Sequence, residues 1–252
     1  MKIVVAIKQV PSRDSQLKVN ASGTWIEDAD LAWEINEPDA YALEAGLQLR
    51  EKLTGEVVVL CAGPESASQT IREALAKGAD RAIHIESHGF TDPLALARVM
   101  AKALEAEKPD LILTGLQSDD LGYGQTGVIL AEVMGLPHAT IIMNVEPSDH
   151  GIKVKRELEN GWFQQVEMPL PALLTTQSGA TKLRYATLMG IKKAKTKETK
   201  TVTPSATAGA RAITLERVYL PEKQKKTEML TGTPAEVAAK LVEKLKFEVR
   251  VI

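Results

Sequence analysis

Short apolar runs alternate with stretches of helical periodicity through the first 140 residues. The runs are rich in β-branched residues and almost continuously hydrophobic, which predicts strands buried on both faces of a sheet. The stretches between them repeat apolar residues at the spacing of an amphipathic helix. The predicted strands are 3–7, 57–61, 81–85 and 111–114, and the predicted helices are 39–53, 66–77, 92–107 and 125–134. This alternation is typical of βαβ units on a parallel sheet.

Residues that begin and end helices fall where this alternation places them. Gly78 follows the second predicted helix, and Gly135 with Pro137 follows the fourth. Thr91 is the expected N-cap of the third helix, because its hydroxyl can accept a hydrogen bond from a free backbone N–H.

The pattern changes after His138 to alternating apolar and polar positions. The predicted strands are 141–145, 151–157 and 162–168, with a turn at 159–161. We interpret them as antiparallel additions at a sheet edge. Pro169 and Pro171 bracket a last apolar strand, 172–176, at which the compact domain is expected to end.

The C-terminal part of the chain has a different composition. Lys, Thr, Ala and Ser dominate 192–207 without an apolar period, which is typical of an exposed linker. Thr233 and Pro234 then predict the start of a helix. Its apolar face comprises Val237, Leu241 and Leu245. About 50 residues with one amphipathic helix cannot form a core, so this helix is expected to cover its own sheet or another chain.

Composition narrows the class of protein. The 252 residues are 44% hydrophobic and 25% charged, as in globular proteins, and the net charge of −2 favours neither nucleic acid nor an anionic membrane as partner. Cys61 has no disulfide partner in the chain, and the four histidines show no metal-ligand spacing. The first apolar run is too short for a signal peptide, and no run approaches a membrane span. A soluble, cytoplasmic protein is expected.

A glycine-rich loop at 115–127 follows the fourth predicted strand and contains a literal GxGxxG, from Gly122 to Gly127. A dinucleotide fingerprint sits directly after its strand, whereas this one begins seven residues beyond Gly115, so the Rossmann interpretation is weak. The glycines and the start of a helix near Gln125 still favour an anion such as phosphate, and Thr126 adds a hydroxyl. The alternative is a turn that merely connects strand to helix.

Open parallel sheets bind ligands at the carboxyl ends of their strands, where Ala6 with Lys8, residues 62–64 and the Gly115 loop should converge. In the polar loop that opens the first helix, Asn36 and Asp39 either cap the helix or face an adenine or ribose. No set of side chains predicts catalysis. Core packing or solvation explains Cys61, His84, Asp119 and Asp120 equally well.

A second informative stretch is 184–195, in which apolar residues are followed by lysines. Leu188, Met189 and Ile191 could anchor a partner, with the lysines as a polar rim. A short helix packed against its own domain is the alternative.

These segments resemble the β subunit of electron transfer flavoproteins along nearly the whole chain. The match rests on VAIKQVP at 5–11, NEPDAYALE at 36–44, AKGADRAI at 76–83, the loop ending in QTG at 125–127 and VKRELENGWFQQVEMPLPALLT at 154–175. The resemblance implies an open, mainly parallel, doubly wound α/β sheet of the adenine nucleotide α-hydrolase type, with antiparallel edge strands and an extended C-terminal arm. It implies a nucleotide-binding domain at 1–191, and a linker and arm at 192–252 that packs on a partner α subunit.

The resemblance further implies an electron carrier without catalytic residues of its own. The α subunit carries the redox-active FAD, and the β subunit holds a structural AMP. Residues at matching positions around the nucleotides are Ala6, Asn36, Glu37, Pro38, Asp39, Ala62, Gln117, Asp119, Asp120, Gly122, Tyr123, Gly124, Gln125, Thr126, Gly127 and Val128. A recognition loop at 184–195 would dock flavin dehydrogenases of the acyl-CoA type through Tyr185, Leu188, Met189 and Ile191, and a membrane quinone oxidoreductase would receive the electrons.

Two alternatives stay open. One branch of the family binds a second FAD in place of AMP and bifurcates electrons; its members tend to show Asp-Gly-Asp before the Gln-x-Gly turn, where this chain has Leu121, Gly122 and Tyr123. The other alternative is a stand-alone ATP- or AMP-binding module of the stress-protein type. An ATP pyrophosphatase is disfavoured, because the first strand is followed by Lys8-Gln9-Val10-Pro11 and not by a Ser-Gly-Gly phosphate loop.

Overall fold

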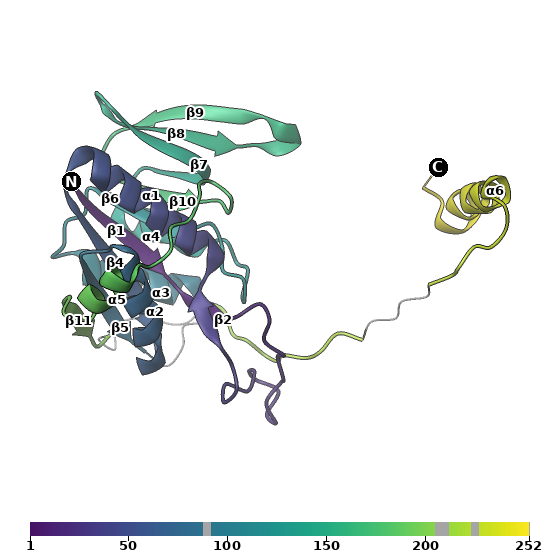
Figure 1. The fold of residues 1–252 in the computed structure, drawn as a ribbon, viewed down its shortest axis with the longest axis horizontal. Helices are drawn as coiled ribbons and strands as arrows, with labels where there is room; N and C mark the ends of the chain where they lie inside the picture. The colour runs from purple at the N-terminus through teal and green to yellow at the C-terminus, as the bar shows by residue number, and fades with distance from the viewer. Residues whose placement is uncertain (88–91, 205–211, 223–226, 252) are drawn as a thin grey trace. The chain divides into compact units, whose positions relative to one another are not determined.

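The computed structural model describes residues 1–87, 92–204, 212–222 and 227–251. The chain divides into two compact units, Met1–Val218 and Tyr219–Ile252. The first unit contains the sheet and its covering helices (Figure 1). The second contains one capped helix.

The sheet of the first unit has the strand order β11-β5-β4-β1-β6-β10-β7-β8-β9. Neighbours from β11 to β7 are parallel, and β8 and β9 add to β7 as an antiparallel hairpin. The strands are β1 (Lys2–Ile7), β4 (Glu56–Gly63), β5 (Arg81–Glu86), β6 (Leu111–Gly115), β7 (His138–Ser148), β8 (Gly151–Glu157), β9 (Phe163–Met168), β10 (Ala172–Thr176) and β11 (Thr199–Val202). The expected open, mainly parallel sheet is confirmed.

Helices cover both faces of this sheet (Figure 1). One core contains Ile3 and Val5 of β1 with the apolar side chains of α1 and α2, and the other contains Val4 with those of α3 and α4. Alternate residues of a strand point to opposite faces, so a strand buried on both faces must be apolar throughout. The helices are α1 (Glu37–Leu53), α2 (Ser68–Lys77), α3 (Pro93–Leu104), α4 (Thr126–Met134) and α5 (Leu188–Ala194). A separate antiparallel pair joins β2 (Gln9–Pro11) to β3 (Trp33–Ile35).

The linker prediction is wrong for Thr199–Val202, which form the edge strand β11 parallel to β5. The first compact unit therefore continues beyond the strand at which the apolar pattern ends. Edge strands are held by backbone hydrogen bonds and need little apolar surface, so a mostly exposed Thr-Lys-Thr-Val run carries no period that predicts it. The β-branched Thr and Val residues still suit a strand.

The N-cap of α3 is Asp92, and the prediction of Thr91 is wrong; Thr91 itself lies outside the described residues. One carboxylate oxygen of Asp92 accepts hydrogen bonds from the backbone N–H groups of Leu94 at 2.8 Å and Ala95 at 3.3 Å. The other accepts from Ala212 and from Ile213 at 3.2 Å. Asp92 thus caps a helix and also fixes the segment that precedes the second unit.

The helix of the second unit is α6 (Pro234–Lys244), which continues into a π-helical turn, Leu245–Val249. Thr233 is its N-cap, as predicted, and forms a capping box with Glu236. None of the residues of α6 is buried. Within this unit, Leu241 and Val242 of the helix and Phe247 of the π-helical turn expose apolar surface.

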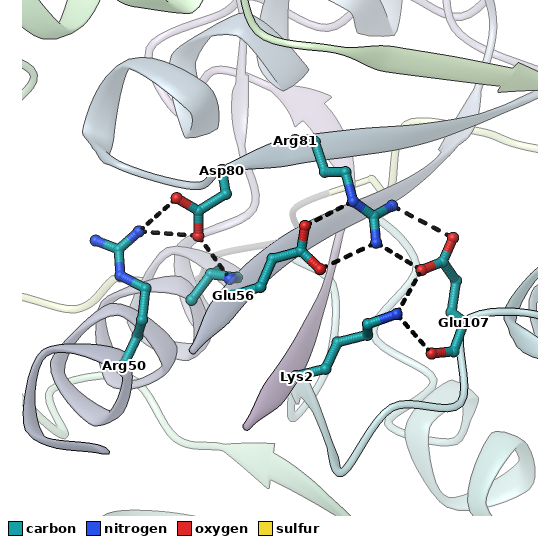
Figure 2. Close-up of polar contacts among 7 residues, drawn as sticks. Lys2, Arg50, Glu56, Asp80, Arg81 and Glu107 are labelled. Atoms are coloured by element: carbon teal, nitrogen blue, oxygen red, sulfur yellow. Dashed lines mark hydrogen bonds and ion pairs between the residues drawn. The ribbon is translucent and has the colours of Figure 1, made fainter. Parts of the chain in front are cut away.

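A charge network ties the amino ends of three neighbouring strands together (Figure 2). The Arg81 guanidinium binds Glu56 through Nε at 2.8 Å and Glu107 through Nη2 at 2.6 Å. Lys2 Nζ donates to the Glu107 carboxylate at 3.3 Å. Hydrogen bonds from Arg81, opposed by burial and reinforced by Lys2, lower the pKa of Glu107. This network links the strands at their amino ends, opposite to the carboxyl ends.

No helix among the described residues has both the length and the apolar character needed to cross a bilayer.

Candidate functional site

The chain reverses its winding direction between β1 and β6, which are neighbours in the sheet. The connection that follows β1 leads to α1 on one face, and the loop that follows β6 leads to α4 on the other face. The two connections therefore diverge at the carboxyl ends of the strands. A crevice at such a switch point is where open α/β sheets bind ligands.

Asp39 joins the two strand ends at this switch point. Its Oδ2 accepts a hydrogen bond from the Lys8 N–H and its Oδ1 one from the Gly115 N–H, both at 2.8 Å. A Cβ at Gly115 would lie 2.3 Å from Asp39 Oδ1, so a glycine is required there. Asp39 is 6% exposed, and burial raises its pKa to about 7 although both backbone hydrogen bonds oppose the shift.

Asn36 occupies the N-cap position of α1, but its side chain makes no cap hydrogen bond, so the expected side-chain cap is wrong. Its Nδ2 donates to the Gln117 carbonyl and its Oδ1 accepts from the Asp119 N–H, both at 2.9 Å. The side chain is 1% exposed. Asn36 therefore fixes the loop after β6 to the start of α1, 83 positions earlier in the chain.

Two cations neutralise the acidic residues of this loop. Lys8 Nζ lies 2.6 Å from the Asp120 carboxylate and 3.4 Å from Ser118 Oγ. Arg13 binds Glu37 and also reaches Asp119 at 3.5 Å. Sequence spacing gave Asp119 and Asp120 no partner, because both cations come from the start of the chain. Because these carboxylates are paired with cations, they repel an anion near the loop less than free carboxylates would.

The helix α4 begins after the loop that follows β6, one residue after the predicted start. Gln125 is its N-cap, without a side-chain cap hydrogen bond, and the loop reaches it through Gly122 and Gly124 at φ of +64° and +63°. These left-handed conformations favour glycine. The first N–H groups of a helix lack intrahelical partners, so those of α4 can bind an anion.

Gly127 lets this helix start lie directly on the sheet. A Cβ at Gly127 would be 2.6 Å from Thr114 Oγ1 and 2.7 Å from Thr175 Cγ2. Ala6 and Ala62 lie near the carboxyl ends of β1 and β4, in or against the core that α3 and α4 cover. The structure thus brings Ala6, Ala62 and the Gln125–Gly127 turn to one end and one face of the sheet.

The other predicted nucleotide-site residues are distributed around this end. Glu37, Pro38 and Asp39 lie in the first turn of α1, on the opposite face. Residues 117–124 form the loop between β6 and α4, in which Tyr123 is half-buried. Val128 is half-buried in the first turn of α4.

Cys61 and His84 belong to the core. Burial, followed by the nearby charge of Asp39, raises the pKa of the Cys61 thiol to about 12, which leaves it protonated and weakly nucleophilic at neutral pH. His84 lies beside it on β5 and has its Nε2 3.1 Å from the Gly63 carbonyl oxygen. The described residues include no cluster of three or more metal-ligating side chains.

The stretch predicted to dock a partner forms the short helix α5 with the residues before it. The alternative of a helix packed on its own domain is partly right, because Ala194 is buried and Gly190 lies against the carbonyl of Ala76. The four predicted docking residues are nevertheless exposed, by 90%, 82%, 62% and 46% respectively: Tyr185, Leu188, Met189 and Ile191.

Comparison with known proteins agrees with this arrangement. Residues 23–207 match the family model described as the electron transfer flavoprotein domain, which defines the class of protein. The chain is 36% identical to the electron transfer flavoprotein subunit beta of Bradyrhizobium diazoefficiens, over the full length of both. It is 34% identical to that of Methylophilus methylotrophus, covering 96% of this chain and 97% of the relative, and 33% identical to the human protein, covering 98% and 97%. The chain belongs to the electron transfer flavoprotein β-subunit family.

Proposed function

We propose that this chain pairs with an α subunit, which holds most of a redox-active FAD, and that the chain itself binds AMP in the crevice between β1 and β6. The observation that carries the proposal is the start of α4. Its uncapped N–H groups, approached through left-handed glycines, lie at the switch point of a parallel sheet. The names of the relatives support the subunit role.

The residues present fit an adenine nucleotide. The N–H groups of the first turn of α4 and the Thr126 hydroxyl would bind the phosphate. Ala6 and Ala62 would leave space for the base and ribose. Asn36 and Asp39 hydrogen-bond to protein backbone, so their role would be to hold the loop and the strand ends in place.

The nucleotide would be structural, and the FAD of the partner would supply the electron-transfer chemistry. The contribution of this chain would be positional: it would complete the partner's flavin site and recruit donors. Leu188, with Tyr185, Met189 and Ile191, would insert into flavin dehydrogenases of the acyl-CoA type. A small apolar anchor with a cationic rim suits short-lived contacts, as an electron carrier between dehydrogenases and a membrane quinone oxidoreductase requires.

The second unit would complete the heterodimer. The exposed apolar side of α6 would pack on the α subunit, because burying Leu241, Val242 and Phe247 removes apolar surface from water. A single helix cannot bury these residues within its own unit.

Co-expression with an α subunit encoded in the same organism tests this proposal. We expect both chains to co-purify with a flavin absorbance spectrum and one FAD per heterodimer. Purification as a stable, flavin-free single chain that binds ATP would favour the stand-alone nucleotide module instead.

A further inference from the structure

The helix α5 is too short to be stable by itself. It has seven residues and exposes Leu188, Met189 and Ile191, whereas isolated helices need roughly 12 residues or more to be even marginally stable in water. Its orientation must therefore come from contacts with the rest of the first unit. One such contact is at Gly190, where a Cβ would lie 2.3 Å from the carbonyl oxygen of Ala76 on α2.

Lys197 makes a second contact with the same end of α2. Its Nζ donates to the carbonyl oxygen of Leu75 at 3.0 Å and to that of Ala79. The Leu75 carbonyl lies in the last turn of α2 and also accepts a hydrogen bond from the Gly78 N–H at 3.3 Å, and Ala79 follows the helix. Carbonyls at this end of a helix carry partial negative charge, which favours an ammonium beside them. Lys197 is half-buried, and this burial lowers its pKa.

The segment that carries α5 is thus fixed on both sides. Before it, Arg184 binds Glu44 at 2.8 Å and Glu51 at 2.7 Å, both on α1. After it, Lys197 binds the end of α2, and the Glu198 carbonyl accepts a hydrogen bond from the Ala82 N–H at 2.9 Å. The exposed apolar residues of α5 therefore lie between two attachments to the domain.

We propose that Lys197 is a positioning residue for partner docking. Its ammonium, bound to the carbonyls at the end of α2, holds α5 so that Leu188 and its neighbours face solvent in one arrangement. This inference rests on the docking role proposed above for Leu188. An anchor that is already ordered loses less conformational entropy on binding, so releasing Lys197 weakens docking and leaves the flavin site unchanged.

The test compares Lys197→Met, Lys197→Arg and Lys200→Met in the purified heterodimer. Lys200 is the matched control, because it is an exposed lysine of the adjoining strand β11. Four quantities are measured: amide hydrogen exchange in residues 188–194, the flavin content, and the KM and kcat for reduction of the heterodimer by a purified acyl-CoA dehydrogenase. Lys197→Met should speed exchange in α5 and raise KM about three- to tenfold, with kcat and flavin content unchanged. Lys197→Arg, which can still donate, should be intermediate, and Lys200→Met should match the wild type.

Several results would overturn the inference. Unchanged exchange in α5 would show that Lys197 does not hold the helix. Exchange that rises equally in α1 and β4 would indicate general destabilisation. A third result is faster exchange in α5 of Lys197→Met with an unchanged KM, while Leu188→Ala has a raised KM. It would show that Lys197 holds the helix but that this positioning does not contribute to docking. If Leu188→Ala also leaves KM unchanged, the docking role itself fails, and the effect on exchange distinguishes that outcome from the others.

Discussion

The side-chain oxygen of Asn36 accepts a hydrogen bond from the backbone N–H of Asp119 at 2.9 Å, which joins the start of α1 to the loop that follows β6. The same side chain donates to the Gln117 carbonyl. Two hydrogen bonds from one buried amide fix both ends of a three-residue stretch. The loop that leads to the start of α4 is therefore ordered by the residue before α1.

Replacing Asn36 with Ala should weaken nucleotide binding. The change leaves the Asp119 N–H and the Gln117 carbonyl without their partner, at a cost of about 1–3 kcal/mol, and the loop loses its fixed geometry. We expect the affinity of nucleotide-depleted heterodimer for AMP, measured by calorimetry, to fall about tenfold. Asn144→Ala, at an exposed asparagine of β7, should bind AMP as the wild type does. Equal affinities of Asn36→Ala and wild type would contradict this role of Asn36.

The sequence predicted the sheet, its helices and the glycine-lined start of α4, because these follow from local periodicity and from glycine and proline placement. It did not predict the contacts that shape the crevice. Lys8 meets Asp120 across 112 positions, and Asp39 meets Gly115 across 76. The spacing of such residues along the sequence does not reveal the contact, because it is the order of the strands in the sheet that brings them together.

Two other features were missed for different reasons. β11 has almost no apolar content, since backbone pairing with β5 stabilises it. The contact of Lys197 with α2 was missed because, in the sequence, Lys197 looks like any lysine of a solvated linker. For Leu188 the sequence left two interpretations open, an exposed anchor and a short helix packed on its own domain, because apolar residues followed by lysines fit both.

Replacing Gly127 with Ala should displace the start of α4. The added Cβ would overlap Thr114 Oγ1 and Thr175 Cγ2, and overpacking of this kind costs about 1–3 kcal/mol. We expect the purified heterodimer to lose its AMP and keep its FAD, as measured by chromatography of the extracted nucleotides. Glu132→Ala, on the exposed side of the same helix, is the control. Full AMP occupancy in Gly127→Ala would show that the phosphate lies elsewhere.

Replacing Leu188 with Ala should impair docking alone. Truncating an interface anchor typically costs about 1–2 kcal/mol, which corresponds to a rise in KM of about tenfold for donor-dependent reduction. Flavin content and kcat should stay at wild-type values, because Leu188 is exposed on α5, away from the crevice. Leu17→Ala, at another exposed leucine, should have no effect. Equal turnover at low carrier concentration in Leu188→Ala and wild type would refute the assignment.

The charge network at the amino ends of the strands should contribute to stability in a pH-dependent way. Arg81→Met removes the main partner of Glu107. We expect a loss of about 2 kcal/mol, which should lower the unfolding temperature of the purified heterodimer at pH 7 by roughly 4–8 °C. Since the folded pKa of Glu107 lies below its ordinary value of 4.5, the pair stabilises the fold fully above that pH. Its contribution is lost as pH falls through the folded pKa.

Unfolding temperatures of wild type and Arg81→Met should therefore converge as the pH is lowered below 4.5. Nucleotide content should not change, because the network lies at the amino ends of the strands and the proposed nucleotide site lies at their carboxyl ends. A difference in unfolding temperature that is constant with pH would show that Arg81 acts through packing and not through its ion pairs.

The central claim is that the crevice between β1 and β6 holds an AMP whose phosphate lies on the first turn of α4. The most direct measurement is the identity and number of nucleotides released when the purified heterodimer is denatured. The account predicts one FAD and one AMP per heterodimer. Two FADs would place the protein in the bifurcating branch, and a single FAD with no second adenine nucleotide would contradict the claim.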